Sequence, residues 1–202
     1  TSAESILLMP FASNEAPGTQ NQLGYYYGPP ALNGGNGEYS LLSTGITSNA
    51  GWKAADRRKS FIYVSAGKNW LSKYPTGGLF IDYAPVIRYA EVLLNLAEAR
   101  VRSTNTVDPQ AILLLNAVRG RSDASTIFTV GDFASSAALA DAILIERRIE
   151  LLGEGLAGSD LTRLGLTLPA KPGVNAVPAT AQQYIWPISS NELLLNTLMT
   201  DN

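Results

Sequence analysis

Aromatic side chains are the first residues of this chain whose types and spacing suit a binding chemistry. Tyr25, Tyr26 and Tyr27 are consecutive in a stretch rich in glycine and proline, and Trp52 follows in the same loop-rich region. Aromatic rings bind the apolar C–H faces of sugars, while neighbouring polar groups fix the orientation of the ligand. Rings on glycine-rich loops suit an exposed platform. These four residues are the predicted ligand-binding site; the alternative is that each ring packs its own loop.

Carboxylates form the second candidate, because Glu146, Glu150 and Glu154 repeat at the spacing of one helix face. Glycosidases use a pair of carboxylates, which makes a polysaccharide hydrolase one hypothesis. Arg147 and Arg148 stand among these glutamates, however, and such a mixture is typical of a salt-bridged surface or interface. Ion pairs between helices are the favoured interpretation, and the charged residues expected in them are Arg88, Glu91, Arg119 and Glu150.

Other chemistries are excluded by composition. The chain has no Cys and no His, so it has no disulfide, thiolate nucleophile, zinc finger or histidine-based triad. No glycine loop for phosphate and no nucleophile elbow is present. Asn33, Asn36 and Glu38 offer oxygen ligands, but a single carboxylate is little for calcium and a plain turn is favoured. We expect no cofactor and no metal.

Length and charge place further bounds. The 202 residues, 46% of them hydrophobic, suit one folded domain. With 15 Lys and Arg against 17 Asp and Glu, the net charge is −2, which argues against a nucleic-acid partner. No run of about eighteen apolar residues is present, so no helix is expected to span a membrane.

The elements that must position these residues change in character near Asp82. Residues 1–81 hold much of the glycine, proline and asparagine, which predicts a loop-rich region with short strands at residues 6–9 and 60–65. This region contains the candidate aromatic residues. Residues 82–202 follow a helical period and are predicted to form a helical region. The two regions together are expected to make one unit.

The helical region should begin with two helices that pack as an antiparallel hairpin. Pro85 suits the first position of the first helix, and Asp108 followed by Pro109 suits the start of the second. Gly120 is expected to end the second helix. Such a hairpin is the unit of tetratricopeptide-like solenoids. The apolar stripe expected on the first helix is Val86, Ala90, Leu93 and Ala97.

A third helix is predicted at residues 136–152, with the glutamates on a different face from its apolar stripe. A helical turn at residues 160–165, a loop at 167–183 and a last short helix at 192–195 should follow. The predicted fold is therefore mainly α, with a tetratricopeptide-like hairpin, further helices, long irregular loops and a few short strands. The stripe expected on the third helix is Ala142, Ile145, Ile149 and Leu152.

Several phrases in the chain resemble those of the SusD/RagB family, and they occur in the order of that family. The similar phrases are RYAE with a following AEA at 88–99, LNAVRGR at 115–121, ERRIEL with EG at 146–155, DLTR at 160–163, and WPI with later Glu and Asn at 186–196. Two weaker landmarks are ESI at 4–6 and the DRR of 56–58, where the family has DPR. At 156–159 the chain lacks the arginine and aromatics that the family usually has there. The resemblance is to the C-terminal half of the family.

This resemblance implies a non-catalytic, cell-surface lipoprotein of the outer membrane. Such a protein captures oligosaccharides or polysaccharides, or peptides in some members, for import by a SusC-like TonB-dependent channel. Its membrane association would come only from an N-terminal lipid anchor that is missing from this sequence. Two alternatives remain at this point, a peptide- or protein-binding interaction module and, less favoured, a polysaccharide hydrolase.

Overall fold

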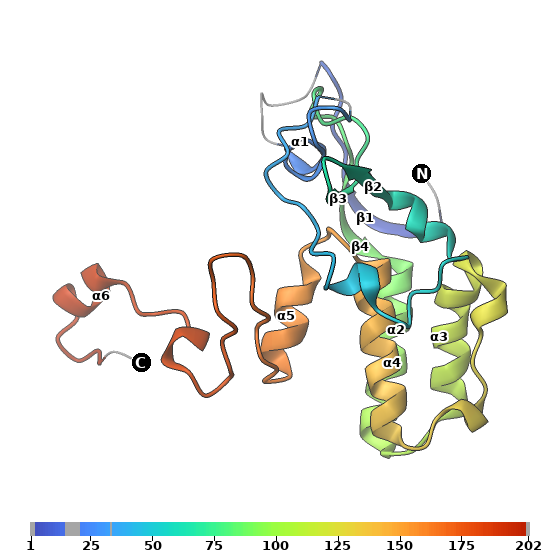
Figure 1. Cartoon of the computed structure of the whole chain (residues 1–202). Coiled ribbons are helices and arrows are strands. Elements are labelled where there is room, and N and C mark those ends of the chain that lie inside the picture. Colours follow the sequence, from blue (N-terminus) through green and yellow to red (C-terminus); the bar gives the residue numbers. More distant parts are fainter. Residues whose placement is uncertain (1–2, 15–20, 33, 201–202) are drawn as a thin grey trace. The chain divides into compact units, whose positions relative to one another are not determined.

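The computed structural model of the chain describes residues 3–14, 21–32 and 34–200. It consists of two compact units, Thr1–Gly155 and Leu156–Asn202 (Figure 1), and each is described by itself below. The change from irregular to helical structure near Asp82 lies within the first unit. Among the described residues, no helix has both the length and the apolar character needed to cross a membrane.

Three helices form the main core of the first unit, as the prediction of a mainly helical fold requires. They are α2 (Tyr89–Thr104), α3 (Pro109–Ser122) and α4 (Ser136–Glu150). The first two pack as a hairpin, and α4 lies against both (Figure 1). Alanines on α2 and α3 leave room for close approach of the helices. The buried core residues are Ala90, Leu94, Ala97, Val101, Ala111, Ile112, Leu115, Val118, Leu139, Ala140 and Ile143.

The start of α3 is as predicted, but its end is not. The Asp108 carboxylate accepts hydrogen bonds from the backbone N–H groups of Gln110 and Ala111, and Pro109 takes the first helical position. The prediction that Gly120 ends the helix was wrong, since α3 continues to Ser122. Arg119 and Ser122 are both buried, so packing of this last turn outweighs the weak helix propensity of one glycine.

The start of α2 also differs from the prediction. Residues Ala84–Arg88 form strand β4, which pairs antiparallel with β1 (Ser5–Met9), so the placement of Pro85 and Val86 in the helix was wrong. Val86 and Ile87 are β-branched, which favours a strand when a partner strand is present. Val86 is accordingly 45% exposed, and the buried face of α2 begins at Ala90.

The remaining elements of the first unit are short. Strands β2 (Ile62–Ser65) and β3 (Lys68–Leu71) form a hairpin in continuous register. Its turn, Ala66-Gly67, has positive φ at both residues, as a type I′ turn requires. Strand β2 is thus two residues shorter than the strand predicted at residues 60–65. The short helices are α1 (Leu23–Tyr27), η1 (Ile46–Ser48), η2 (Arg57–Phe61), η3 (Ala124–Thr126) and η4 (Val130–Asp132).

The second unit has little regular structure. It contains α5 (Leu156–Arg163), η5 (Gln182–Tyr184) and α6 (Ser190–Leu195), with a long loop between the first two. The Tyr184 hydroxyl donates hydrogen bonds to the backbone oxygens of Leu161 and Leu166, which fixes the end of this loop near α5. The predicted helical turn, loop and last short helix are all present.

The helical core predicts that substitution by alanine lowers stability very differently at two leucines of α3. Leu115 is fully buried, whereas Leu113 is 61% exposed on the same helix. Leu115→Ala should lower the free energy of unfolding by about 2–5 kcal/mol, because it leaves a cavity among three packed helices. Leu113→Ala should change it by less than about 0.5 kcal/mol. Urea unfolding followed by circular dichroism measures both, and equal losses would contradict this placement of the core.

Candidate functional site

Two of the three predicted tyrosines line an open hollow. Tyr26 and Tyr27 of α1 face it together with Tyr39, and its volume is about 560 Å³. None of the described residues that line it is charged. The other lining residues are Met9, Phe11, Asn21, Gln22, Leu23 and Ala84. An uncharged, partly aromatic surface with two amide side chains is thus the chemical character of this site.

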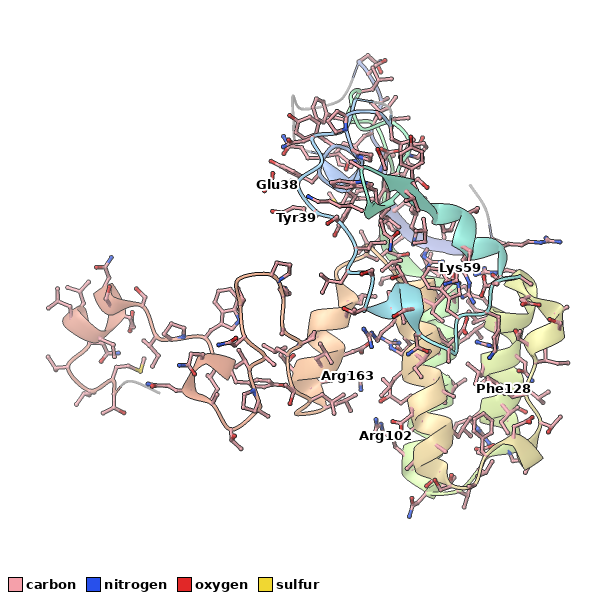
Figure 2. All side chains as sticks on the ribbon, viewed as in Figure 1. Glu38, Tyr39, Lys59, Arg102, Phe128 and Arg163 are labelled. Carbon is pink, nitrogen blue, oxygen red and sulfur yellow. The ribbon has the colours of Figure 1, made fainter. Side chains whose placement is uncertain are left out.

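Backbone hydrogen bonds bring Tyr39 beside the α1 tyrosines. Three N–H groups of the following loop donate to α1 and its cap: Asn36 to Tyr25 at 2.6 Å, Gly37 to Gly28 at 2.8 Å, and Tyr39 to Tyr26 at 3.0 Å. As a result the ring centroids of Tyr26 and Tyr39 are 5.7 Å apart, and those of Tyr27 and Tyr39 are 6.2 Å apart. Figure 2 shows the side chains of Glu38 and Tyr39 projecting from this loop.

A glycine sets the position of α1. A Cβ on Gly24 would lie 2.6 Å from the Asp82 carboxylate and 2.7 Å from the backbone oxygen of Tyr74. Only glycine permits so close an approach of two backbones. The Asp82 carboxylate also accepts a hydrogen bond from the backbone N–H of Thr76, at 3.0 Å. Together these contacts hold α1 against the segment around residues 74–82.

The rings behind the hollow are fixed by other rings. Tyr27 stacks on Tyr74 with centroids 6.2 Å apart, and the Tyr74 hydroxyl donates to the backbone oxygen of Gly153. Burial raises the pKa of Tyr74, so it remains a neutral hydrogen-bond donor. Tyr25 packs against Tyr26 and Phe80 and is not among the lining residues. Tyr25 therefore supports the hollow from behind.

The structure does not bring Trp52 to this hollow. Its side chain is 4% exposed and packs with Ile46 and Ile149. The ammonium group of Lys59 lies 4.2 Å from the centroid of a Trp52 ring and donates to the backbone oxygen of Thr47. Trp52 thus occupies a small core at the end of α4, apart from the tyrosines.

Sequence reasoning did not single out Tyr39. The available signal was a tyrosine that directly follows a glycine-rich loop, the same context that pointed to the earlier tyrosines. Of the oxygen ligands weighed in that loop, Asn33 lies outside the described residues, and the Asn36 amide donates to Glu38. Within the described part of the chain, no cluster of three acidic residues could hold a metal.

The glutamates of α4 lie inside the protein and not on its surface. Glu146 has no exposed area, and Glu150 is 6% exposed. The prediction that the glutamates lie on a face away from the buried stripe was therefore wrong, because Glu146 and Glu150 are buried together with Leu139 and Ile143. Of the predicted stripe, Ile149 is buried, and Ala142, Ile145 and Leu152 pack partly buried against core residues. Arginines compensate these charges, which is why a helix can bury them.

Each glutamate binds several arginines. Glu146 accepts hydrogen bonds from Arg58 at 2.5 Å and from Arg119 at 2.9 Å. Glu150 accepts from Arg58 at 2.9 Å, from Arg88 at 2.8 Å and from Arg121 at 2.6 Å. The expected ion pairs of Arg88, Arg119 and Glu150 are confirmed. Glu91, also expected there, takes no part among the described residues.

This geometry is unsuited to acid–base catalysis. Burial raises the pKa of Glu150, but the charges and hydrogen bonds of Arg88 and Arg121 outweigh it and hold that pKa below its ordinary value. A general acid needs a raised pKa. A second hollow of about 390 Å³ borders this cluster. Four of its five lining cations, Arg58, Lys73, Arg88 and Arg121, pair with carboxylates, and the fifth is the exposed Arg57. The cluster thus stabilises the fold.

Comparison with known proteins agrees with the resemblance in the sequence. The model of the SusD family matches residues 53–170, and the chain belongs to this family. Over 122 residues it is 32% identical to the SusD-like protein P38 of Formosa agariphila, an alignment that covers 58% of this chain and 24% of that protein.

Solved structures share the fold. A SusD superfamily protein from Bacteroides fragilis is 33% identical, with a TM-score of 0.75 over 98% of this chain and 45% of its own. Surface glycan-binding protein A from Bacteroides thetaiotaomicron is 18% identical, with a TM-score of 0.68 over 100% of this chain and 52% of its own. The chain therefore spans about half the length of these structures, and the second likeness shows the fold alone.

The buried ion cluster predicts that loss of one carboxylate charge strongly lowers the free energy of unfolding. Glu146→Gln keeps the shape of the side chain but removes the carboxylate charge that pairs with the buried Arg119, and one of the three carboxylates that pair with Arg58. It should lower the free energy of unfolding by about 3–5 kcal/mol. Glu91→Gln on α2 is the control and should change it by less than about 0.5 kcal/mol. Chemical denaturation measures both, and a neutral Glu146→Gln variant would refute the structural role of this cluster.

The lowered pKa of Glu150 predicts a loss of stability in acid. The unfolded chain protonates this residue near its ordinary value of about 4.3, whereas the folded chain does so at lower pH. Its contribution to stability is therefore full above that value and is lost as pH falls through the folded pKa. Urea unfolding between pH 3 and pH 7 should show this decline in the wild type and a shallower one in Glu150→Gln. If stability fell with pH equally in the wild type and in Glu150→Gln, the lowered pKa of Glu150 would be contradicted.

Proposed function

We propose that this chain is part of a non-catalytic glycan-binding protein. The observation that supports the proposal is the group of three tyrosines, Tyr26, Tyr27 and Tyr39, around one uncharged hollow. The C–H faces of a sugar pack well on such rings, and the side-chain amides of Asn21 and Gln22 offer hydrogen bonds beside them.

The size and openness of the hollow fit an oligosaccharide segment. Its volume of about 560 Å³ lies within the usual range of ligand pockets. Tyr39 is 53% exposed, so a ligand can reach the rings without a rearrangement of the loop. Of the nine lining residues, all except Ala84 belong to residues 1–81, which supports the proposed ligand-binding role of this loop-rich region.

The comparisons support a carbohydrate ligand by family. Two matched structures are described as a surface glycan-binding protein and as a SusD-like carbohydrate binding protein from Bacteroides vulgatus. The hydrolase hypothesis has little support, because Glu146 and Glu150 are buried and bound by arginines. In the part of the chain that the structure describes, no aspartate or glutamate lines the tyrosine hollow.

On the basis of its family, we also propose a partner and a cellular location for this protein. The protein would lie on the cell-surface side of the outer membrane and deliver glycans to a SusC-like TonB-dependent channel. Attachment to the membrane would come from an N-terminal lipid anchor. Membership of the SusD family supports these statements.

A protein- or peptide-binding role is the second candidate. It is favoured by exposed leucines in and after α6, where Leu194 is 76%, Leu195 is 83% and Leu198 is 93% exposed. Apolar side chains grouped on a surface are common at protein contacts. This observation concerns the second unit and is compatible with a glycan site in the first.

Affinity electrophoresis against a panel of soluble polysaccharides tests the glycan proposal. At least one glycan should retard the folded chain, and Tyr26→Ala and Tyr39→Ala should each weaken that binding about tenfold, as truncation of a central aromatic contact does. The matched control is Tyr89→Ala, since Tyr89 is 51% exposed on α2 and does not line the hollow.

The outcomes of this experiment are distinct. Retardation that survives both hollow variants would place the glycan elsewhere on the molecule. If no polysaccharide retards the folded wild type, the glycan proposal fails for this chain and the interaction hypothesis takes its place.

A further inference from the structure

One side-chain amide in the tyrosine hollow has a donor without an acceptor. Asn21 is 5% exposed and lines the hollow, and its Nδ2 is buried without a hydrogen-bond partner. Its Oδ1 accepts from the backbone N–H of Leu23 at 3.4 Å, which fixes which end of the amide is oxygen. Four buried side-chain atoms of the described residues lack a partner, and only that of Asn21 belongs to a residue of this hollow.

An unpartnered buried donor is informative because it is unfavourable in the empty protein. Buried polar groups are nearly always hydrogen-bonded, and an exception calls for an explanation. Asn21 lines an open hollow, so a ligand oxygen would accept this hydrogen bond once the amide, whose Nδ2 has almost no exposed surface, turns toward the hollow. Binding then restores a bond that folding leaves unmade, and a ligand without an acceptor at that point is disfavoured.

The charges around the hollow restrict the ligand further. Among the described residues no cation lines it, and Glu38 directly precedes the lining residue Tyr39. Hydrogen bonding to the Glu38 carboxylate, together with its negative charge, raises the pKa of Tyr39. A carboxylate or sulfate on a sugar would lose water here with no cation to replace it, and it would be repelled by Glu38.

Resting on the proposed function, we infer that this hollow selects neutral glycans, and that one of their oxygens accepts a hydrogen bond from Asn21 Nδ2. Suitable acceptors are a ring oxygen, a hydroxyl or the carbonyl of an acetamido group. Uronic acids and sulfated sugars are excluded from this site. Four of the five cations that line the second hollow already pair with carboxylates, so that hollow offers an anion a single exposed arginine, Arg57.

Matched pairs of polysaccharides test the selection by charge. Suitable pairs are dextran and dextran sulfate, hydroxyethyl cellulose and carboxymethyl cellulose, and methyl-esterified and de-esterified pectin. In any pair that binds, the neutral member should bind at least about tenfold more tightly, because the anion gains no ion pair to offset its lost hydration. Glu38→Gln should narrow that difference severalfold by removing the repulsion.

Asn21→Leu tests the role of the amide. The two side chains are similar in size, so the variant removes the donor while keeping the packing. Binding of the neutral glycan should weaken roughly fivefold to tenfold, the effect of one hydrogen bond. The variant also removes Oδ1, which accepts the long 3.4 Å hydrogen bond from the Leu23 N–H. The melting temperature should therefore change little, because the loss of this bond is offset by the removal of an unpaired buried donor. A purely structural asparagine would instead give a lower melting temperature with unchanged glycan binding.

The results separate this inference from the function on which it rests. If no polysaccharide retards the folded wild type, the glycan-binding proposal itself fails. If glycans bind through Tyr26 and Tyr39 but the anionic members bind as tightly as the neutral ones, selection by charge is overturned. If Asn21→Leu binds like the wild type, the hydrogen bond from Asn21 is overturned while the aromatic site stands.

Discussion

Two glutamates inside the first unit, Glu146 and Glu150, bind arginines that come from distant parts of the sequence. Arg58 lies in the loop-rich region, Arg88 ends β4, and Arg119 belongs to α3. A buried carboxylate without such partners would be strongly unfavourable, so each arginine segment is required to reach α4. Hydrophobic packing joins the three helices to one another. These ion pairs, together with the packing of Ile46 and Trp52 on Ile149, join the loop-rich part of the first unit to the helices.

The tyrosine hollow depends on the same end of α4, although no residue of the ion cluster lines it. Tyr27 stacks on Tyr74, whose hydroxyl donates to Gly153, three residues after Glu150. Lys73, the neighbour of Tyr74, pairs with Glu154 and also donates to backbone oxygens at the helix end. A rigid helix end therefore fixes the back wall of a site whose front is made by loops, an arrangement common in binding proteins.

Local patterns in the sequence correctly predicted features that depend only on neighbouring residues. The cap at Asp108 and the helix hairpin need only neighbouring residues, and both are present. Residues 84–88 became a strand because β1, about eighty residues earlier, supplies the pairing. The face of α4 was misassigned because burial of Glu146 depends on arginines that no periodicity reveals. Tyr39 reached the site through backbone hydrogen bonds to α1, which side-chain patterns do not encode.

The two hollows of the first unit differ in the charged residues that line them. Beside α4, four of the five lining cations pair with carboxylates, so most of the free energy of their interaction goes into stability. Around the tyrosines, no described lining residue is charged, and one amide donor is left unpaired. Folding already pairs most charges of the first hollow, whereas in the proposed function a bound glycan completes the second. That asymmetry, more than the number of rings, is the physical reason to place binding at the tyrosines.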